Sequence, residues 1–196
     1  LGTTISEEFL MTNIYQGVLP HEYQHMINFN LHYNLNGGNT EVSWLNEALS
    51  HLIEDLRYVD ADNYMAGSGP ENPARVESYL ASIDTLCFTC GTSLSQRGGA
   101  YLFLRYLYEQ AELGNLAGAT SGADLIGKLS NTDQRSFDNV IQAAFGSSGT
   151  DADFLSELGL FGLAVYLSDT GLSTDDRLNF NGINLRSTQD DNRGTV

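Results

Sequence analysis

Two histidines and two glutamates in the first quarter of the chain have the types and spacing of a metal-dependent hydrolytic site. His21, Glu22 and His25 form the pattern H-E-x-x-H, and Glu47 follows His25 by 22 positions. Residues four apart lie on one face of a helix, so both imidazoles can bind one cation. In this pattern the glutamate acts as a general base. Glu47 is the candidate for a third ligand, which would complete a shell of three protein groups and one water.

Two amphipathic helices are needed to position these side chains. The first is expected to begin or kink near residues 15–18, since Pro20 is tolerated in a first turn, and to fade at residues 36–38. The second is expected over residues 44–59, where apolar residues recur at helical spacing: Leu45, Ala48, Leu49, Leu52, Ile53 and Leu56. Glu47 lies within this second helix.

The remainder of the chain also has helical patterns. Asn72-Pro73 is typical of a helix cap and first turn, and an apolar helix is expected to follow Gly98-Gly99 and to end near residue 114. Three further helices are expected over residues 124–129, 133–145 (capped by Asn131 or Thr132) and 151–167 (capped by Thr150). The sequence therefore predicts a mainly α fold with little or no β-sheet, with one domain over residues 1–170 and a polar C-terminal extension over residues 171–196.

The charge balance disfavours several classes of partner. The chain has 25 acidic and 9 basic residues, a formal net charge of −16, which opposes binding to nucleic acid or to an anionic membrane. The longest apolar run, residues 158–167, is interrupted by two glycines and is too short to span a bilayer. The acidic surface fits a secreted protein, and because Leu1 is not an initiator methionine and no signal-peptide pattern follows it, we expect a fragment or a processed product whose targeting signal, if any, has been removed. Nothing in the sequence indicates an oligomeric state.

The alternatives to metal binding differ for the histidines and the cysteines. His21 and His25 would otherwise be partly buried structural histidines, and Glu47 a solvated helix charge. The spacing and the expected helices together favour the metal site. Cys87 and Cys90 form a single C-F-T-C without further ligands at matching spacing, so a local disulfide or two free thiols is favoured over a zinc or thioredoxin-like site.

The segments HEYQHMINF and WLNEALSHLIED resemble the gluzincin metallopeptidases. Within that clan the chain most resembles the hyicolysin family of secreted bacterial metallopeptidases, and its N-E core is similar to that of thermolysins and membrane-alanyl-type aminopeptidases. The resemblance covers residues 17–55 well and residues 99–110 more loosely. It implies a zincin-like, thermolysin-type helical catalytic lobe, a zinc cofactor, a protein or peptide substrate, and the activity of a secreted metalloendopeptidase.

The resemblance also implies roles for the four residues of the motif. His21, His25 and Glu47 would be the zinc ligands. Glu22 would be the base that takes a proton from the attacking water and passes it to the leaving amine. Zinc lowers the pKa of its water to about 7, so hydroxide is available at neutral pH.

A hydrolytic site also needs a donor for the tetrahedral oxyanion besides the metal. Gluzincins commonly use a tyrosine or histidine from a later helix, which makes Tyr101 the first candidate, followed by Arg97 and Tyr79. The alternative is that Tyr101 is a core aromatic residue, and its apolar neighbours favour this alternative.

Three more residues of the second helix are candidates to orient the ligands. Glu54 lies seven positions after Glu47 on the same face, and either Glu54 or the adjacent Asp55 is a candidate partner for a ligand histidine. A solvent-facing charge is the alternative for both. His51 lies four positions after Glu47, where thermolysins have an acidic residue, so it is either a group at the site or a surface or core histidine.

A second cofactor candidate is calcium. Asp60, Asp62 and Asn63 form an acidic loop directly after the second helix. Their spacing does not match an EF-hand, and a solvated loop is the favoured interpretation.

Two other functions are open from the sequence. One is a catalytically silent relative that serves as a binding module, which the intact His21, Glu22, His25 and Glu47 oppose. The other is an aminopeptidase, which would need an acidic anchor for the substrate amine on an upstream segment. Gluzincins place a β-rich lobe before the H-E-x-x-H helix, whereas twenty residues precede His21 here, so the resemblance implies either a lobe upstream of this chain or a reduced fold.

Overall fold

The computed structural model describes residues 5–7, 10–56 and 71–186, and these residues are mainly helical. The elements are η1 (Leu10–Val18), α2 (Leu19–Phe29), η2 (Asn30–Leu35), α3 (Ser43–Leu56), α5 (Glu71–Leu80), α6 (Leu94–Glu112), α7 (Gly122–Ser130), α8 (Ser136–Phe145), α9 (Asp151–Leu167) and η3 (Asp176–Leu178). These ranges contain no strand, which confirms the mainly α prediction. Within them, no helix is both long and apolar enough to cross a membrane.

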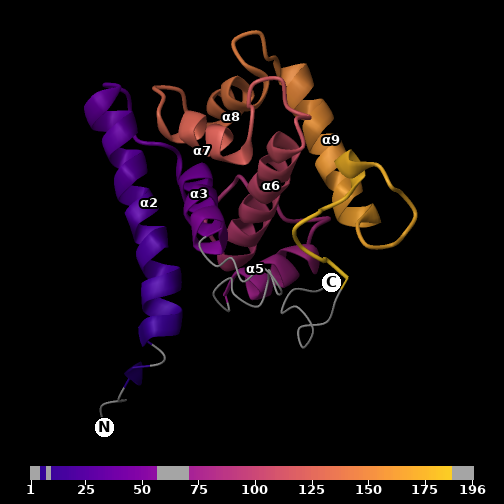
Figure 1. The fold of residues 1–196 in the computed structure, drawn as a ribbon, viewed down its shortest axis with the longest axis horizontal. Coiled ribbons are helices and arrows are strands. Elements are labelled where there is room, and N and C mark those ends of the chain that lie inside the picture. The colour runs from indigo at the N-terminus through magenta and orange to yellow at the C-terminus, as the bar shows by residue number, and fades with distance from the viewer. Residues whose placement is uncertain (1–4, 8–9, 57–70, 187–196) are drawn as a thin grey trace.

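The first three elements form one continuous rod along an edge of the molecule (Figure 1). Pro20 lies in the first turn of α2, directly after the π-type segment, and Val18 at the boundary keeps a helical conformation (φ −64°, ψ −41°), so the helix continues through this position. The preceding π-type segment η1 carries the helical path back to Leu10, which is earlier than the sequence suggested. The rod ends at Asn36, and Gly37 follows with a φ of +68°, a left-handed conformation that favours glycine.

Helix α6 lies at the centre of the fold and packs against α3, α5 and α7 (Figure 1). Its side chains Tyr101, Leu102, Phe103, Leu104, Tyr106 and Leu107 are fully buried or nearly so. From α3, Leu45, Leu49 and Leu52 pack into the same core. Because α2 packs on the far side of α3, the rod is attached to the body mainly through α3.

The start of α6 differs from the prediction. Ser93 and Gln96 form a capping box, so the helix begins at Leu94 and Gly98-Gly99 lie inside it instead of before it. A Cβ at Gly98 would overlap the backbone of Arg75 in α5, and one at Gly99 would overlap the ring of Tyr79. The two glycines are therefore positions of close approach between α5 and α6, not a helix breaker.

The connection between α5 and α6 contains a disulfide between Cys87 and Cys90, which is one of the two alternatives left by the sequence. Phe88, between the cysteines, packs edge-on against Trp44 and Tyr79 and contacts Phe103 of α6. The short disulfide loop therefore covers part of the core.

Two of the expected helix caps, Thr150 and Asn72, differ in outcome. Thr150 caps α9 as predicted, with Asp153 completing a capping box. Asn72 lies inside α5, and its side chain donates to the carbonyl oxygen of His51 and accepts from Arg75. Its role is thus to join α5 to α3.

Helix α8 begins three residues later than expected, at Ser136 instead of residue 133. The prediction that Asn131 or Thr132 caps this helix is wrong. Arg135 occupies the cap position without a side-chain bond, and the backbone N–H of Ser136 donates to Glu41 at 2.8 Å. A carboxylate almost a hundred positions earlier in the chain therefore satisfies this helix start.

Residues 171–186 do not behave as a polar surface extension. Phe180, Ile183 and Leu185 are buried in the main core. The Glu109 carboxylate of α6 accepts hydrogen bonds from the backbone N–H groups of Asn181 and Gly182. Three buried apolar residues within six positions therefore dock this largely polar segment on the core.

The close approach of α5 and α6 predicts opposite effects for the same substitution at two helical glycines. Gly98→Ala should lower the free energy of unfolding by about 1–3 kcal/mol, because the new methyl group meets backbone atoms that cannot rotate away. Gly127→Ala in α7, where a Cβ meets nothing within 4 Å, should raise it by about 0.5–1 kcal/mol. Urea unfolding of both variants is the measurement, and equal effects would contradict the packing described here.

Candidate metal site

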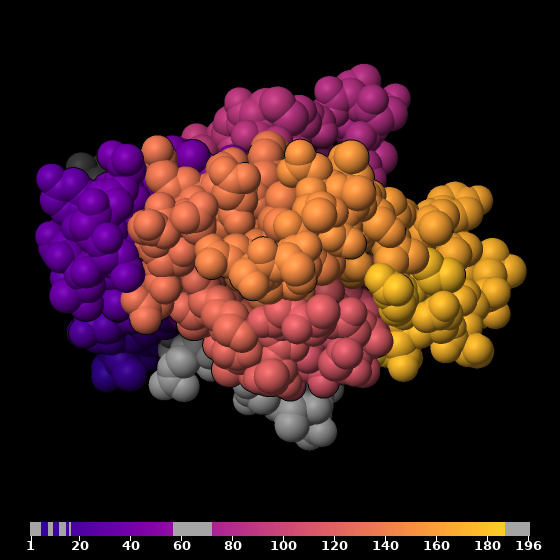
Figure 2. Space-filling view, turned by 90° about the horizontal axis from the view of Figure 1, so that it is seen from above, coloured from indigo at the N-terminus to yellow at the C-terminus, as the bar shows by residue number. Residues whose placement is uncertain are grey.

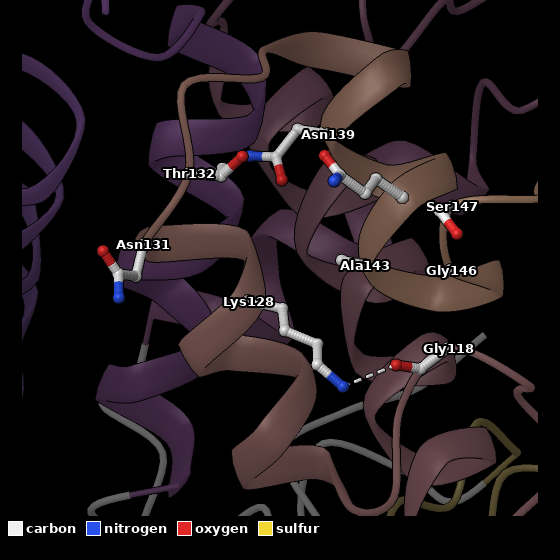
Figure 3. Close-up of a pocket in the computed structure, with 9 residues that line it drawn as sticks. Gly118, Lys128, Asn131, Thr132, Asn139, Ala143, Gly146 and Ser147 are labelled. Carbon is white, nitrogen blue, oxygen red and sulfur yellow. Dashed lines mark hydrogen bonds between the residues drawn. The ribbon is translucent and has the colours of Figure 1, made fainter. Parts of the chain in front are cut away.

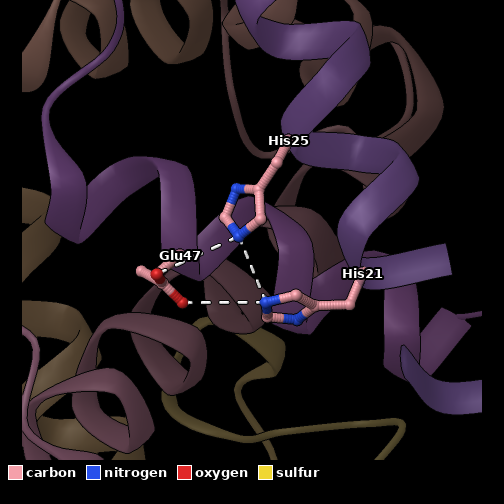
Figure 4. A group of neighbouring side chains, drawn as sticks. All are labelled: His21, His25 and Glu47. Atoms are coloured by element: carbon pink, nitrogen blue, oxygen red, sulfur yellow. Dashed lines mark hydrogen bonds and ion pairs between the residues drawn. The ribbon is translucent and has the colours of Figure 1, made fainter. Parts of the chain in front are cut away.

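The contact between α2 and α3 brings His21, His25 and Glu47 together, as the sequence predicted (Figure 4). The two Nε2 atoms lie 3.2 Å apart. His21 Nε2 is 3.7 Å from Glu47 Oε2, and His25 Nε2 is 3.9 Å from Glu47 Oε1. The three side chains point toward one common position between the two helices.

The groups that contact Nδ1 of His21 and of His25 indicate which nitrogen of each imidazole carries the proton. His21 Nδ1 lies 3.3 Å from Glu54 Oε2, and a carboxylate can only accept, so we infer that Nδ1 is protonated. His25 Nδ1 lies 3.1 Å from the hydroxyl of Ser50, which can accept in the same way. Both Nε2 atoms then present lone pairs to each other and to Glu47. Three acceptors converge without a proton between them, an arrangement that a cation would stabilise.

The spacing of these atoms fits a metal ion. Ligands bound at about 2.0–2.1 Å in a tetrahedral shell lie roughly 3.3–3.4 Å from one another. The separations of 3.2, 3.7 and 3.9 Å need only small side-chain adjustments to reach that geometry. Glu47 Oε2 is buried and accepts no well-aligned hydrogen bond, although Arg97 Nη1 approaches it at 3.2 Å. The group therefore has both the donor atoms and the unsatisfied acceptor expected of a metal site.

Glu54 orients two rings at once. Its Oε2 is 3.3 Å from His21 Nδ1 and 3.0 Å from His51 Nδ1. Burial alone would raise the pKa of Glu54, but the hydrogen bonds with His21 and His51 outweigh burial and hold the pKa at about 2. This geometry supports the sequence-based hypothesis that Glu54 orients a candidate ligand histidine, instead of the alternative of a solvent-facing charge.

His51 belongs to the site as a buried neighbour of the ligands. Its side chain is 1% exposed, and its Nε2 lies 3.8 Å from Glu47 Oε2. Burial lowers the pKa of His51, and the nearby Arg75 acts in the same direction, while the hydrogen bond to Glu54 opposes both. The imidazole is therefore held neutral between two carboxylates.

Tyr101 and Asp55 do not join the cluster. The Tyr101 side chain is 0% exposed, and its hydroxyl donates to Asp55 Oδ2 at 2.7 Å. Burial raises the pKa of Tyr101 well above its usual value. Arg105 also approaches Asp55 Oδ2, at 3.3 Å. Asp55 is thus committed to α6 instead of a ligand histidine, and Tyr101 has the core role that the sequence left as its alternative.

The other two oxyanion candidates differ in position. Tyr79 is buried against Phe88 and is part of the core. Arg97, at the start of α6, places Nη1 3.2 Å from Glu47 Oε2 with 30% of its side chain exposed. Of the three oxyanion-donor candidates from the sequence, Arg97 is the one whose side chain reaches the His21–His25–Glu47 cluster.

Glu22 is exposed beside His21 in the first turn of α2. No hydrogen bond or ion pair joins its carboxylate to another residue in the part of the chain that the structure describes. Among the described residues, therefore, nothing competes with solvent or substrate for the Glu22 carboxylate.

Two residues of the site were not identified from the sequence. Ser50 lies three positions after Glu47 on the same helix face, and this spacing was a usable signal. Arg75 reaches His51 Nδ1 at 3.4 Å from α5, and only the packing of α5 on α6 places it there. The calcium candidates Asp60, Asp62 and Asn63 lie outside the described residues.

A separate hollow of about 290 Å³ lies between α7 and α8 (Figure 3). Its lysine, Lys128, donates to the carbonyl oxygen of Gly118 and to Asp124, both at 2.7 Å. The Asn139 amide is equally committed, to Glu41 and to the carbonyl oxygen of Leu129. Because these polar groups bind one another, the hollow does not compete with the His21–His25–Glu47 cluster as a functional site.

Comparison of the chain with models of known protein families finds no match. Comparison with curated proteins finds no significantly similar relative.

The contact between Glu54 and His21 predicts that the metal affinity of the His21–His25–Glu47 cluster depends on a residue outside the cluster. Glu54→Gln should weaken zinc binding by about 10–100-fold, because an uncharged partner makes His21 Nε2 a poorer ligand. Competition with a chromophoric chelator measures the affinity. Asp138→Asn, a matched change at an exposed carboxylate of α8, should leave it unchanged. Equal affinities in wild type and Glu54→Gln would contradict the orienting role.

The same carboxylate should make the metal-free fold sensitive to acid. The pKa of Glu54 is about 2 in the fold against an ordinary 4.5, so its contribution to stability is complete above about pH 4.5 and is lost as the pH falls toward 2. The difference in urea-unfolding free energy between wild type and Glu54→Gln should therefore be constant at higher pH and shrink across this window. A difference that stays constant down to pH 2 would show that Glu54 is not held ionised.

Proposed function

We propose that this protein is a zinc metallopeptidase that cleaves internal peptide bonds. The observation that carries the proposal is the convergence of two imidazoles and one carboxylate, with the exposed Glu22 next to His21 in the chain. Two histidines and a glutamate are a known ligand set of catalytic zinc, which leaves one position for water. The likeness of both ligand helices to gluzincins supports the same conclusion.

The chain's own residues would divide the reaction between them. Bound zinc supplies Lewis acidity, which polarises the peptide carbonyl and lowers the pKa of water. Glu22 accepts one proton as the water oxygen forms a bond to the carbonyl carbon. Glu22 then delivers that proton to the amide nitrogen as the C–N bond breaks, which leaves a carboxylic acid and an amine. Glu54 and Ser50 hold the two ligand rings in place.

We also place the protein outside the cell. A disulfide between Cys87 and Cys90 is stable in an oxidising compartment, and the charge of −16 suits a secreted hydrolase. The acidic anchor that an aminopeptidase needs would have to lie elsewhere, so an endopeptidase is the simpler assignment for these residues.

The test is hydrolysis of fluorescein-labelled, N-terminally blocked casein by zinc-loaded protein. Cleavage should disappear with a chelator and return with zinc. Glu22→Gln should reduce kcat by about 10²–10⁴-fold with zinc affinity nearly unchanged, because the variant retains the ligands and loses the base. Asp138→Asn is the matched control and should retain full activity.

Each other outcome has a distinct meaning. Cleavage of free N-terminal peptides but not of blocked casein would identify an aminopeptidase. Zinc binding without any cleavage would identify a binding module that keeps its metal for structure. Full activity of Glu22→Gln would show that another group is the base.

A further inference from the structure

We propose that Arg97 is a catalytic residue of this site, whose guanidinium binds the substrate carbonyl oxygen as it becomes an oxyanion. The inference rests on the proposed function and assigns the role for which the sequence suggested Tyr101. It starts from the contact between Arg97 Nη1 and Glu47 Oε2 at 3.2 Å, which places a permanent positive charge at the edge of the cluster.

Two local features orient the Arg97 side chain toward Glu47. Arg97 Nε donates to the carbonyl oxygen of Thr92 at 3.0 Å, which fixes the guanidinium plane at the start of α6. Gly98, the next residue, lets α6 approach α5 closely. With Nε anchored, the terminal nitrogens are directed toward Glu47, and about a third of the side chain is open to solvent and therefore to substrate.

The other nearby arginines of the described chain cannot reach a substrate. Arg75 is buried, and its Nη1 donates to Asn72 and lies 3.4 Å from His51 Nδ1. Arg105 is buried and is paired with Asp55 and Glu109. Both therefore have structural tasks, whereas Arg97 combines a cationic group at the cluster with exposure.

The chemistry of the reaction requires such a group. Attack on a peptide carbonyl moves negative charge onto its oxygen, in a site that already holds the carboxylates of Glu22 and Glu47. A fixed guanidinium offers N–H donors and a full charge to that oxygen, and donors of this kind act mainly in the transition state. The expected signature is a loss of kcat with little change in KM.

A positioning role is the competing explanation, since the same contact could simply hold Glu47 in place. The two roles predict different measurements. A positioning residue would change the affinity for zinc, and excess zinc would restore activity. A catalytic residue would change the affinity for a transition-state analogue in protein that is fully loaded with zinc.

The experiment compares wild type with Arg97→Gln and Arg97→Lys, and uses Arg135→Gln as a matched control at an exposed arginine of the α7–α8 connection. A blocked peptide is chosen from a mapped casein cleavage site, and its phosphinic analogue serves as the tetrahedral probe. Zinc affinity, urea-unfolding midpoint, kcat, KM and the inhibition constant of the probe are measured for each protein.

Arg97→Gln should lower kcat by about 10²–10³-fold and weaken the phosphinic probe by a similar factor, with zinc affinity and KM within about threefold of wild type. Arg97→Lys should recover part of both losses, because it restores the charge without the fork of donors. Arg135→Gln should match wild type.

The inference is overturned if Arg97→Gln cleaves the peptide normally, or if its loss follows zinc affinity and is reversed by excess zinc. Either result leaves the peptidase assignment intact, because wild type would still be active. Zinc-loaded wild type that cleaves neither casein nor peptide overturns the proposed function, and the role of Arg97 falls with it.

Discussion

The structure around α3 depends on the cost of burying carboxylates. Glu47, Glu54 and Asp55 all lie on this helix with little exposed side chain. Removing a charge from water costs several kcal/mol unless donors replace the water, so each of these groups must be met by another element. Their partners are, in order, Arg97, the histidine pair His21 and His51, and Tyr101 together with Arg105. Two of the chain's 9 basic residues, Arg97 and Arg105, therefore contact carboxylates of this one helix.

The same requirement links the site to the rest of the fold. Asp55 holds Tyr101 and Arg105 of α6, and Arg105 also binds Glu109. Glu109 in turn accepts the backbone N–H groups of Asn181 and Gly182. A continuous series of polar contacts therefore runs from Asp55, at the end of α3, through α6 to residues 181–182.

The ligands could be identified from sequence because their geometry is local. The spacing of His21 and His25 places them on one helix face, and the apolar stripe of α3 fixes the direction of Glu47. Which later side chain reaches the cluster could not be predicted in this way, because the choice between Tyr101 and Arg97 depends on how α6 packs against α3. That packing follows from Ser93 starting the helix earlier and from Asp55 accepting the Tyr101 hydroxyl. Long-range partners such as Glu41 at Ser136 have no local signature at all.

The rod formed by η1, α2 and η2 has an unusual position for an element that carries two ligands. It lies along one rim of the molecule (Figure 2), and its Tyr23, Met26, Phe29 and Tyr33 side chains are exposed. An ion held by His21, His25 and Glu47 would act as a cross-link between this rod and the body. Docking of the rod and loading of the ion would then be one coupled equilibrium, to which ion at 100 times its dissociation constant adds about 2.7 kcal/mol. Detachment of the rod would separate His21 and His25 from Glu47.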